Sequence, residues 1–148
     1  MKSLIAIDPG AGGGIASVEC GDVHVEPMPD GLTAMVDLLV RIKAHCPNIR
    51  AVIEKTGKYM PGNSGPASVK FARHCGHIEA ALYALGIPTE QVAPGVWQKA
   101  LGTWPKDKME RKRAIKEEMA RRFPGLRVTL KTADALGILV WAMGRNNG

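Results

Sequence analysis

Hydrophobic and polar residues form two different patterns along the 148-residue chain. Short apolar runs and two-residue alternation, bounded by turn residues, predict strands over residues 3–8, 14–20, 23–27, 50–55 and 87–94, the last as an edge strand. Apolar positions three or four residues apart predict helices over 31–46, 67–85, 95–101, 106–123 and 132–144. The first three strands follow one another through short turns, as in an antiparallel meander. No repeat or linker interrupts this order, so the pattern predicts one α/β domain over residues 1–148.

The apolar faces of the longer helices define the expected core. On helix 31–46 this face comprises Leu32, Met35, Val36, Leu39 and Val40, with Ile42 or Lys43 at its margin. On helix 67–85 the stripe comprises Val69, Ala72, Cys75, Ile78, Leu82 and Leu85. Helix 132–144 is largely apolar, and we expect it to be buried.

Composition narrows the class of protein. Hydrophobic residues make up 45% of the chain and charged residues 23%, which is typical of a globular protein. No apolar run is long enough to span a membrane, and Asp8 and Pro9 interrupt the N-terminal apolar stretch before a signal sequence could form. Cys20, Cys46 and Cys75 form no CxxC pair, which predicts reduced thiols and a cytoplasmic location.

The net charge of +6 is unevenly distributed. Residues 106–148 carry 11 basic and 5 acidic residues, whereas residues 1–50 carry 4 basic and 6 acidic ones. A basic surface favours a polyanion such as nucleic acid as partner, because counterions are released on binding. A solvated basic helix without a partner is the alternative.

The glycine-rich stretch "LIAIDPGAGGGIA", residues 4–16, is not a nucleotide-binding loop. A phosphate-binding P-loop requires a Lys followed by Ser or Thr after its glycines, and here Ile15 and Ala16 follow. A dinucleotide fingerprint requires a third glycine that opens a helix, whereas the residues after Gly14 alternate like a strand. The stretch instead predicts an acid at a strand end, followed by a tight turn into an antiparallel strand.

Acidic residues recur at three element boundaries. Asp8 and Glu54 end apolar strands, and Asp134 lies in the first turn of the apolar helix. If the two strands are parallel neighbours, both carboxylates emerge at the same end of the sheet, where Asp134 could face them. Carboxylates are preferred ligands of Mg²⁺, and two such ions can promote phosphodiester hydrolysis. Strand-end and helix-capping acids, with Thr132 as a nearby cap, are the alternative.

The segments "AIDPGAGGGIA", "AVIEK" and "KTADALGILVWA", in this order and spacing, resemble the ribonuclease-H-like superfamily. More narrowly they resemble RuvC-type Holliday junction resolvases, especially the forms found in phages and chloroplasts, over nearly the whole chain. The resemblance implies a ribonuclease-H-like α/β fold with a mixed five-stranded sheet flanked by helices. It also implies a homodimer formed through helix 67–85, in the cytoplasm or, if phage-encoded, the host-cell cytoplasm.

The resemblance implies an endonuclease that hydrolyses phosphodiester bonds and so nicks two strands of a four-way DNA junction. The reaction would depend on Mg²⁺, and Mn²⁺ could replace this ion. Asp8, Glu54 and Asp134 match the metal-binding carboxylates of the family. Asp8 would bridge two ions, and the other two acids would each complete one site.

One position departs from the family pattern. The family usually has a further Asp or His three or four residues before the last catalytic acid, where this chain has Lys131 and Leu130. Natural variation, an engineered inactivating change and a lysine that contacts the scissile phosphate are three possible explanations. We favour the third, which adds Lys131 to the catalytic set.

Candidate DNA contacts lie in the loop over residues 55–66, at the start of helix 106–123, and at scattered basic positions. The loop contributes Lys55, Lys58, Tyr59, Asn63 and Ser64. The helix start contributes Lys106, Lys108, Arg111, Lys112 and Arg113, where cations oppose the helix dipole. Lys70, Arg73 and Lys99 are weaker candidates.

Other features and functions have simpler interpretations. His74, Cys75 and His77 lack a fourth zinc ligand, and Trp97, Trp104 and Trp141 are expected to be packing residues.

The main rival function is a branched-DNA-binding protein without catalysis, whose metal site is degenerate at Lys131. A fragment of an actin-like kinase or ATPase is a second, since it shares the acid–glycine hairpin.

Overall fold

The computed structural model of the chain describes residues 2–57 and 65–146. Its strands are β1 Leu4–Asp8, β2 Gly14–Glu19, β3 Asp22–Pro27, β4 Arg50–Glu54 and β5 Thr89–Val92. Its helices are α1 Leu32–His45, α2 Gly65–Ala84, α3 Pro94–Leu101, α4 Lys108–Arg122 and α5 Ala133–Asn146. Within this part of the chain, no helix combines the length and apolar character needed to cross a membrane.

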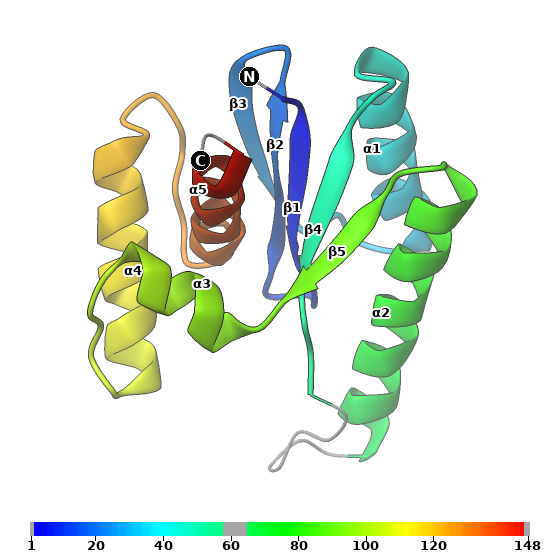
Figure 1. Cartoon of the computed structure of the whole chain (residues 1–148). Helices are drawn as coiled ribbons and strands as arrows, with labels where there is room; N and C mark the ends of the chain where they lie inside the picture. Colours follow the sequence, from blue (N-terminus) through cyan, green and yellow to red (C-terminus); the bar gives the residue numbers. More distant parts are fainter. Residues whose placement is uncertain (1, 58–64, 147–148) are drawn as a thin grey trace.

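The five strands form one mixed sheet in the order β3-β2-β1-β4-β5 (Figure 1). The meander β1-β2-β3 is antiparallel, whereas β4 pairs parallel to β1 and β5 parallel to β4. The sequence prediction of a mixed five-stranded sheet flanked by helices is therefore confirmed, and β5 is an edge strand as expected.

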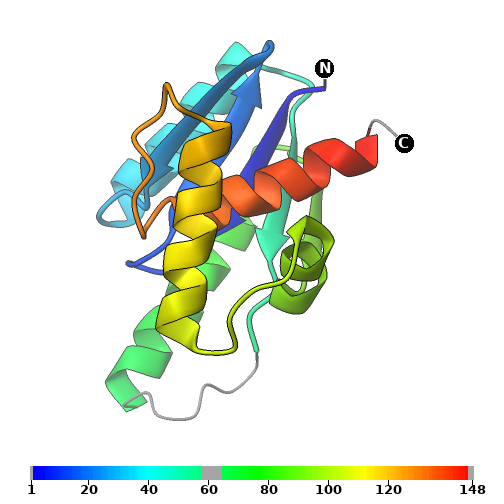
Figure 2. The same ribbon diagram turned by 90° about the vertical axis from the view of Figure 1, so that its left-hand side faces the viewer.

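Side-chain alternation along the strands divides the core into two layers. Ile5 and Ile7 of β1 pack with α1 and α2, whereas Leu4 and Ala6 pack with α3, α4 and α5. Figure 1 shows α1 and α2 on one side of the sheet, and Figure 2 shows α4 and α5 over the other. Strand β1 contributes to both layers and is the middle strand of the sheet, so it lies at the centre of the core.

The glycines after Asp8 allow a close approach of backbone segments. A Cβ atom at Gly13 would overlap the carbonyl oxygen of Asp8, which lies across the turn. A Cβ atom at Gly14 would lie 2.8 Å from the carbonyl oxygens of both Glu26 and Lys131. Gly14 therefore lets the segment before α5 pack directly against the first residue of β2.

The structure corrects parts of the predicted helical faces. Leu32 and Val40 of α1 are 50% and 44% exposed, and the buried face instead includes Leu38. On α2, Ile78 and Leu82 are buried as predicted, but Val69 is 68% exposed and Ala72 is also exposed. The first half of α2 extends past the ends of the strands (Figure 1), so no sheet surface covers it.

The predicted boundaries shift by up to two residues at each end. Helix α4 begins at Lys108 because Asp107 is its N-cap, with a side chain that accepts a hydrogen bond from the Glu110 N–H at 3.0 Å. Strand β5 begins after Pro88, which has no N–H to donate to a neighbouring strand.

Gly137 provides a test of the packing of α5. A Cβ atom there would overlap the ring of Trp97, which is fully buried, whereas Gly144 on the same helix has open space around it. We expect Gly137→Ala to lower the free energy of unfolding by about 2 kcal/mol through overpacking. Gly144→Ala is the matched control and should raise it by up to about 1 kcal/mol, through helix propensity alone. Urea unfolding measures both changes, and a stabilising effect of Gly137→Ala would contradict the packing described here.

Candidate functional site

Asp8 and Glu54 lie at the same end of the sheet. They are the last residues of β1 and β4, and these strands are parallel neighbours paired through Ile7 and Ile53. The sequence-based expectation that both carboxylates emerge together is therefore correct. This end is at the bottom of the sheet in Figure 1.

Strand alternation also decides which way the two acids face. Leu4, Ala6 and Val52 belong to the core layer that contains α5, and Asp8 and Glu54 continue the same two-residue alternation. Both acids therefore lie on the α5 face of the sheet. Helix α5 packs against β1, β2 and β4, and its first turn carries Asp134.

The three carboxylates are close enough to affect one another's ionisation. Burial, reinforced by the negative charges of Glu54 and Asp134, raises the pKa of Asp8 to about 8. Burial also raises the pKa of Glu54, and the charge of Asp134 adds to this effect. The three acids, distant in sequence, thus form one electrostatic group at the end of the sheet.

Trp97 of α3 holds the Glu54 carboxylate in place. Its indole Nε1–H donates a hydrogen bond of 2.7 Å to Glu54 Oε2, which lowers the pKa of Glu54 against the effect of burial. Trp97 is fully buried, and Gly137 gives its ring the space to lie against α5. The sequence identified Trp97 only as a packing residue, because a contact between residues 54 and 97 leaves no local signal.

The first turns of α4 provide positive charge opposite the acids. Lys112 lowers the pKa of all three carboxyl groups. Burial raises the pKa of Asp134, and Lys112, Arg111 and Lys108 oppose this rise. The sequence assigned these cations to DNA, and the structure adds that their charges act on the acids.

The carboxylates suit hard divalent cations, which take oxygen ligands. Within the described residues, the oxygens of Asp8, Glu54 and Asp134 are not all within 4.8 Å of one another. This spacing is wider than the ligand shell of one Mg²⁺ ion with oxygens at about 2.1 Å. The donor set therefore fits either two ions or one ion held by only some of the acids, and cations would offset both the burial and the repulsion that raise the pKa of Asp8.

Lys131 lies on the rim of a hollow of about 730 Å³. Its side chain is exposed, and its backbone packs on Gly14. The hollow lies between the β1–β2 turn, the segment before α1 and the first half of α2, which contributes Lys70, Phe71 and Arg73. The hollow is therefore lined by two predicted DNA contacts, Lys70 and Arg73, and by the predicted catalytic residue Lys131.

The remaining predicted DNA contacts lie mainly at the start of α4, with Lys55 and Lys99 apart from them in the chain. Lys55, Lys99, Lys106, Lys108 and Arg113 are exposed, and Arg111 and Lys112 are partly buried. The Arg111 guanidinium donates to the Lys106 carbonyl at 2.9 Å, so this side chain also closes the loop before α4. Lys58, Tyr59, Asn63 and Ser64 lie outside the described residues.

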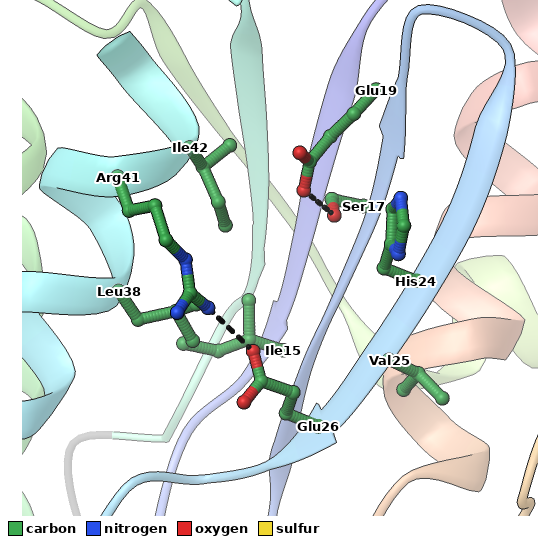
Figure 3. Close-up of a pocket in the computed structure, with 9 residues that line it drawn as sticks. All are labelled: Ile15, Ser17, Glu19, His24, Val25, Glu26, Leu38, Arg41 and Ile42. Carbon is green, nitrogen blue, oxygen red and sulfur yellow. Dashed lines mark hydrogen bonds and ion pairs between the residues drawn. The ribbon is translucent and has the colours of Figure 1, made fainter. Parts of the chain in front are cut away.

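Two further features of the structure are separate from the acidic group. A hollow of about 250 Å³ lies between β2, β3 and α1 (Figure 3). Its charged groups are paired within the protein, as in the 3.2 Å contact between Arg41 and Glu26.

In the described part of the chain, His74, Cys75 and His77 do not converge as a set of metal ligands.

The sequence matches no protein-family model and no curated protein. Among solved structures, the chain is similar to Thermus thermophilus RuvC in complex with a Holliday junction substrate, with a TM-score of 0.65 and 18% identity. This similarity covers 100% of the chain and 97% of that protein. A second Thermus thermophilus RuvC structure has a TM-score of 0.58 at 18% identity and covers 98% and 95%.

These similarities show a RuvC-like fold of the ribonuclease-H-like type. Because the identity is 18% in both cases, the similarities establish the fold alone. The narrower resemblance to the phage and chloroplast forms stays a prediction.

The raised pKa of Asp8 predicts how stability depends on pH. The folded chain binds this proton more tightly than the unfolded chain does, so ionisation of Asp8 costs stability as the pH rises from about 4 to about 8. In metal-free protein, Asp8→Asn should therefore be more stable than the wild type. The gain should grow over this range to a few kcal/mol.

Thermal unfolding in buffers with a chelator measures this difference. Asp37→Asn, a change at an exposed acid on α1, is the matched control and should show no such trend. A constant difference between Asp8→Asn and the wild type from pH 4 to pH 8 would be inconsistent with the proposed electrostatic group.

Proposed function

We propose that residues 1–148 form a single ribonuclease-H-like nuclease domain, a metal-dependent endodeoxyribonuclease that resolves four-way DNA junctions. One observation carries the proposal: three acids from separate elements face one another at one end of the sheet. The RuvC-like fold supports it, since the similar Thermus thermophilus protein was solved with a Holliday junction.

Asp8, Glu54 and Asp134 are the residues that would hold Mg²⁺, or Mn²⁺ in its place. When bound, the cations would polarise the phosphate and favour ionisation of the attacking water. Trp97 fixes the orientation of Glu54 through its 2.7 Å hydrogen bond. Lys112 offsets part of the negative charge before cations bind. It lowers the pKa of each of the three acids, so they ionise at a lower pH than they would without it.

Basic residues on both sides of the acids provide the DNA surface. Lys131, Lys70 and Arg73 line the hollow next to the β1–β2 turn, where phosphate groups of a strand could lie. The start of α4 supplies the second set of cations, in the part of the chain with the largest excess of positive charge. In this proposal Lys131 contacts the scissile phosphate directly.

A homodimer would place two such sites on a two-fold-symmetric junction. The exposed face of α2 is the proposed interface. It carries Val69, Ala72, Gly76, Ala80 and Tyr83 at helical spacing, with Val69 68% and Tyr83 89% exposed. Small residues in the middle of this face permit close contact with a second helix.

Nicking of a synthetic four-way junction tests the proposal. Asp8→Asn, Glu54→Gln and Asp134→Asn should each reduce Mg²⁺-dependent nicking by more than about a thousandfold, because each removes a metal-binding charge. Junction binding in Ca²⁺ should remain. A linear duplex of the same sequence is the control substrate, and Asp37→Asn is the control variant.

The outcomes separate this function from its rival. Binding of the junction without nicking in any divalent cation would favour a branched-DNA-binding protein with a degenerate site at Lys131. In the same assay, Lys131→Ala should nick more slowly than the wild type, and equal or faster nicking would remove the phosphate contact from the proposal.

The hydrogen bond from Trp97 to Glu54 gives a second prediction. Trp97→Phe keeps an aromatic ring but removes the donor, and should reduce nicking by about 10- to 100-fold while raising the Mg²⁺ concentration that is required. Trp104→Phe is the matched control, because Trp104 donates to the Gln98 carbonyl. An equal loss in both variants would mean that Trp97 acts through packing alone.

A further inference from the structure

Cys20, His45 and Cys46 bring three metal-binding side chains together at the other end of the sheet. One donor atom from each residue lies within 4.8 Å of the other two, and no other such set occurs among the described residues. Cys20 lies in the turn between β2 and β3, whereas His45 and Cys46 lie at the end of α1. Because Leu4 pairs with Val18, this turn lies near the start of β1, at the other end of the strand from Asp8.

The two sulfur atoms have a spacing that suits a tetrahedral metal. Cys20 Sγ and Cys46 Sγ are 3.6 Å apart. Two thiolates on one tetrahedral Zn²⁺ ion, each at about 2.3 Å, are separated by about 3.8 Å. A disulfide bond of about 2.05 Å would instead require the sulfurs to approach by roughly 1.5 Å. Metal binding therefore needs little movement of either side chain.

The backbone holds both cysteines in position. The Cys46 N–H donates to the Ile42 carbonyl at 2.8 Å, and the Cys46 carbonyl accepts from the Ile49 N–H at 3.1 Å. Cys20 is in the left-handed region with φ 52°, followed by Gly21 with φ 96°. Asn, Asp and Gly are the usual residues in such two-residue hairpin turns, so turn formation does not explain the cysteine.

We propose that Cys20, His45 and Cys46 bind one Zn²⁺ ion. Two thiolates would balance its charge, and imidazole and thiolate are ligands that Zn²⁺ prefers. Cys46 is only 4% exposed, but Cys20 and His45 are exposed, so a water molecule can take the fourth position. The ion would fasten the β2–β3 hairpin to the end of α1, independently of the acidic group and of the function proposed for it.

Metal titration of the purified full chain tests this site. After reduction with a phosphine and removal of metal, one equivalent of Co²⁺ should produce the near-ultraviolet absorption of a cobalt–thiolate bond. Zn²⁺ should displace the Co²⁺ with a Kd below about 1 μM. Zn²⁺ at about 100 times its Kd should also raise the unfolding temperature by roughly 5 °C.

Variants at exposed positions identify the ligands. Cys20→Ser and His45→Gln should each weaken Zn²⁺ binding by more than about 100-fold and abolish the thermal shift. Cys75→Ser is the matched control because this third thiol lies on α2, outside the set. Asp37→Asn, at an exposed acid on α1 outside both groups, should bind Zn²⁺ like the wild type.

Three results would overturn the zinc site. One is the lack of cobalt–thiolate absorption in the reduced protein. Another is unchanged Zn²⁺ affinity in Cys20→Ser. The third is a loss of affinity in Cys75→Ser as large as that in Cys20→Ser.

Discussion

The gathering of three partly buried carboxylates is the constraint around which this structure is arranged. Burial of Asp8, and then its repulsion by Glu54 and Asp134, raise the free energy of its ionised form, as its pKa of about 8 indicates. The three acids are held together because β1 and β4 pair in parallel and because Gly14 lets the segment before α5 lie on β2. Such stored repulsion is typical of functional sites rather than of structural ones.

The surroundings of the acids combine packing with chemistry. Trp97 belongs to the buried layer and also donates a hydrogen bond to Glu54, and its ring depends on the missing side chain at Gly137. Helix α4 is anchored in the same layer through Ile115 and Met119, and it directs the charge of Lys112 at the acids. Rigid elements therefore set the charge balance of the site, as is required of a site that binds cations with defined geometry.

The two ends of the sheet carry different ligand chemistry. Carboxylate oxygens at the ends of β1 and β4 suit hard cations, whereas sulfur and imidazole donors near the start of β1 suit softer ones. Residues 4–7 of β1 lie between the two groups, so the ions proposed for them would not be in direct contact. This separation lets one end of the sheet be modified while the other keeps its charge balance.

The sequence by itself determined the order of the strands and helices and the positions of Asp8 and Glu54 at strand ends, because hydrophobic periodicity and strand ends are local properties of the chain. The mixed five-stranded sheet was implied by the family resemblance, and the meeting of the two acids was conditional on parallel pairing of their strands, which the structure supplies. Only the tertiary structure decided that Trp97 binds Glu54, that Lys112 faces the acids, and that Cys20 meets Cys46. It also left Val69 and Ala72 exposed, because their helix extends past the sheet that would have covered them. Such contacts depend on how separate elements are placed in space, and no pattern within a single element records that placement.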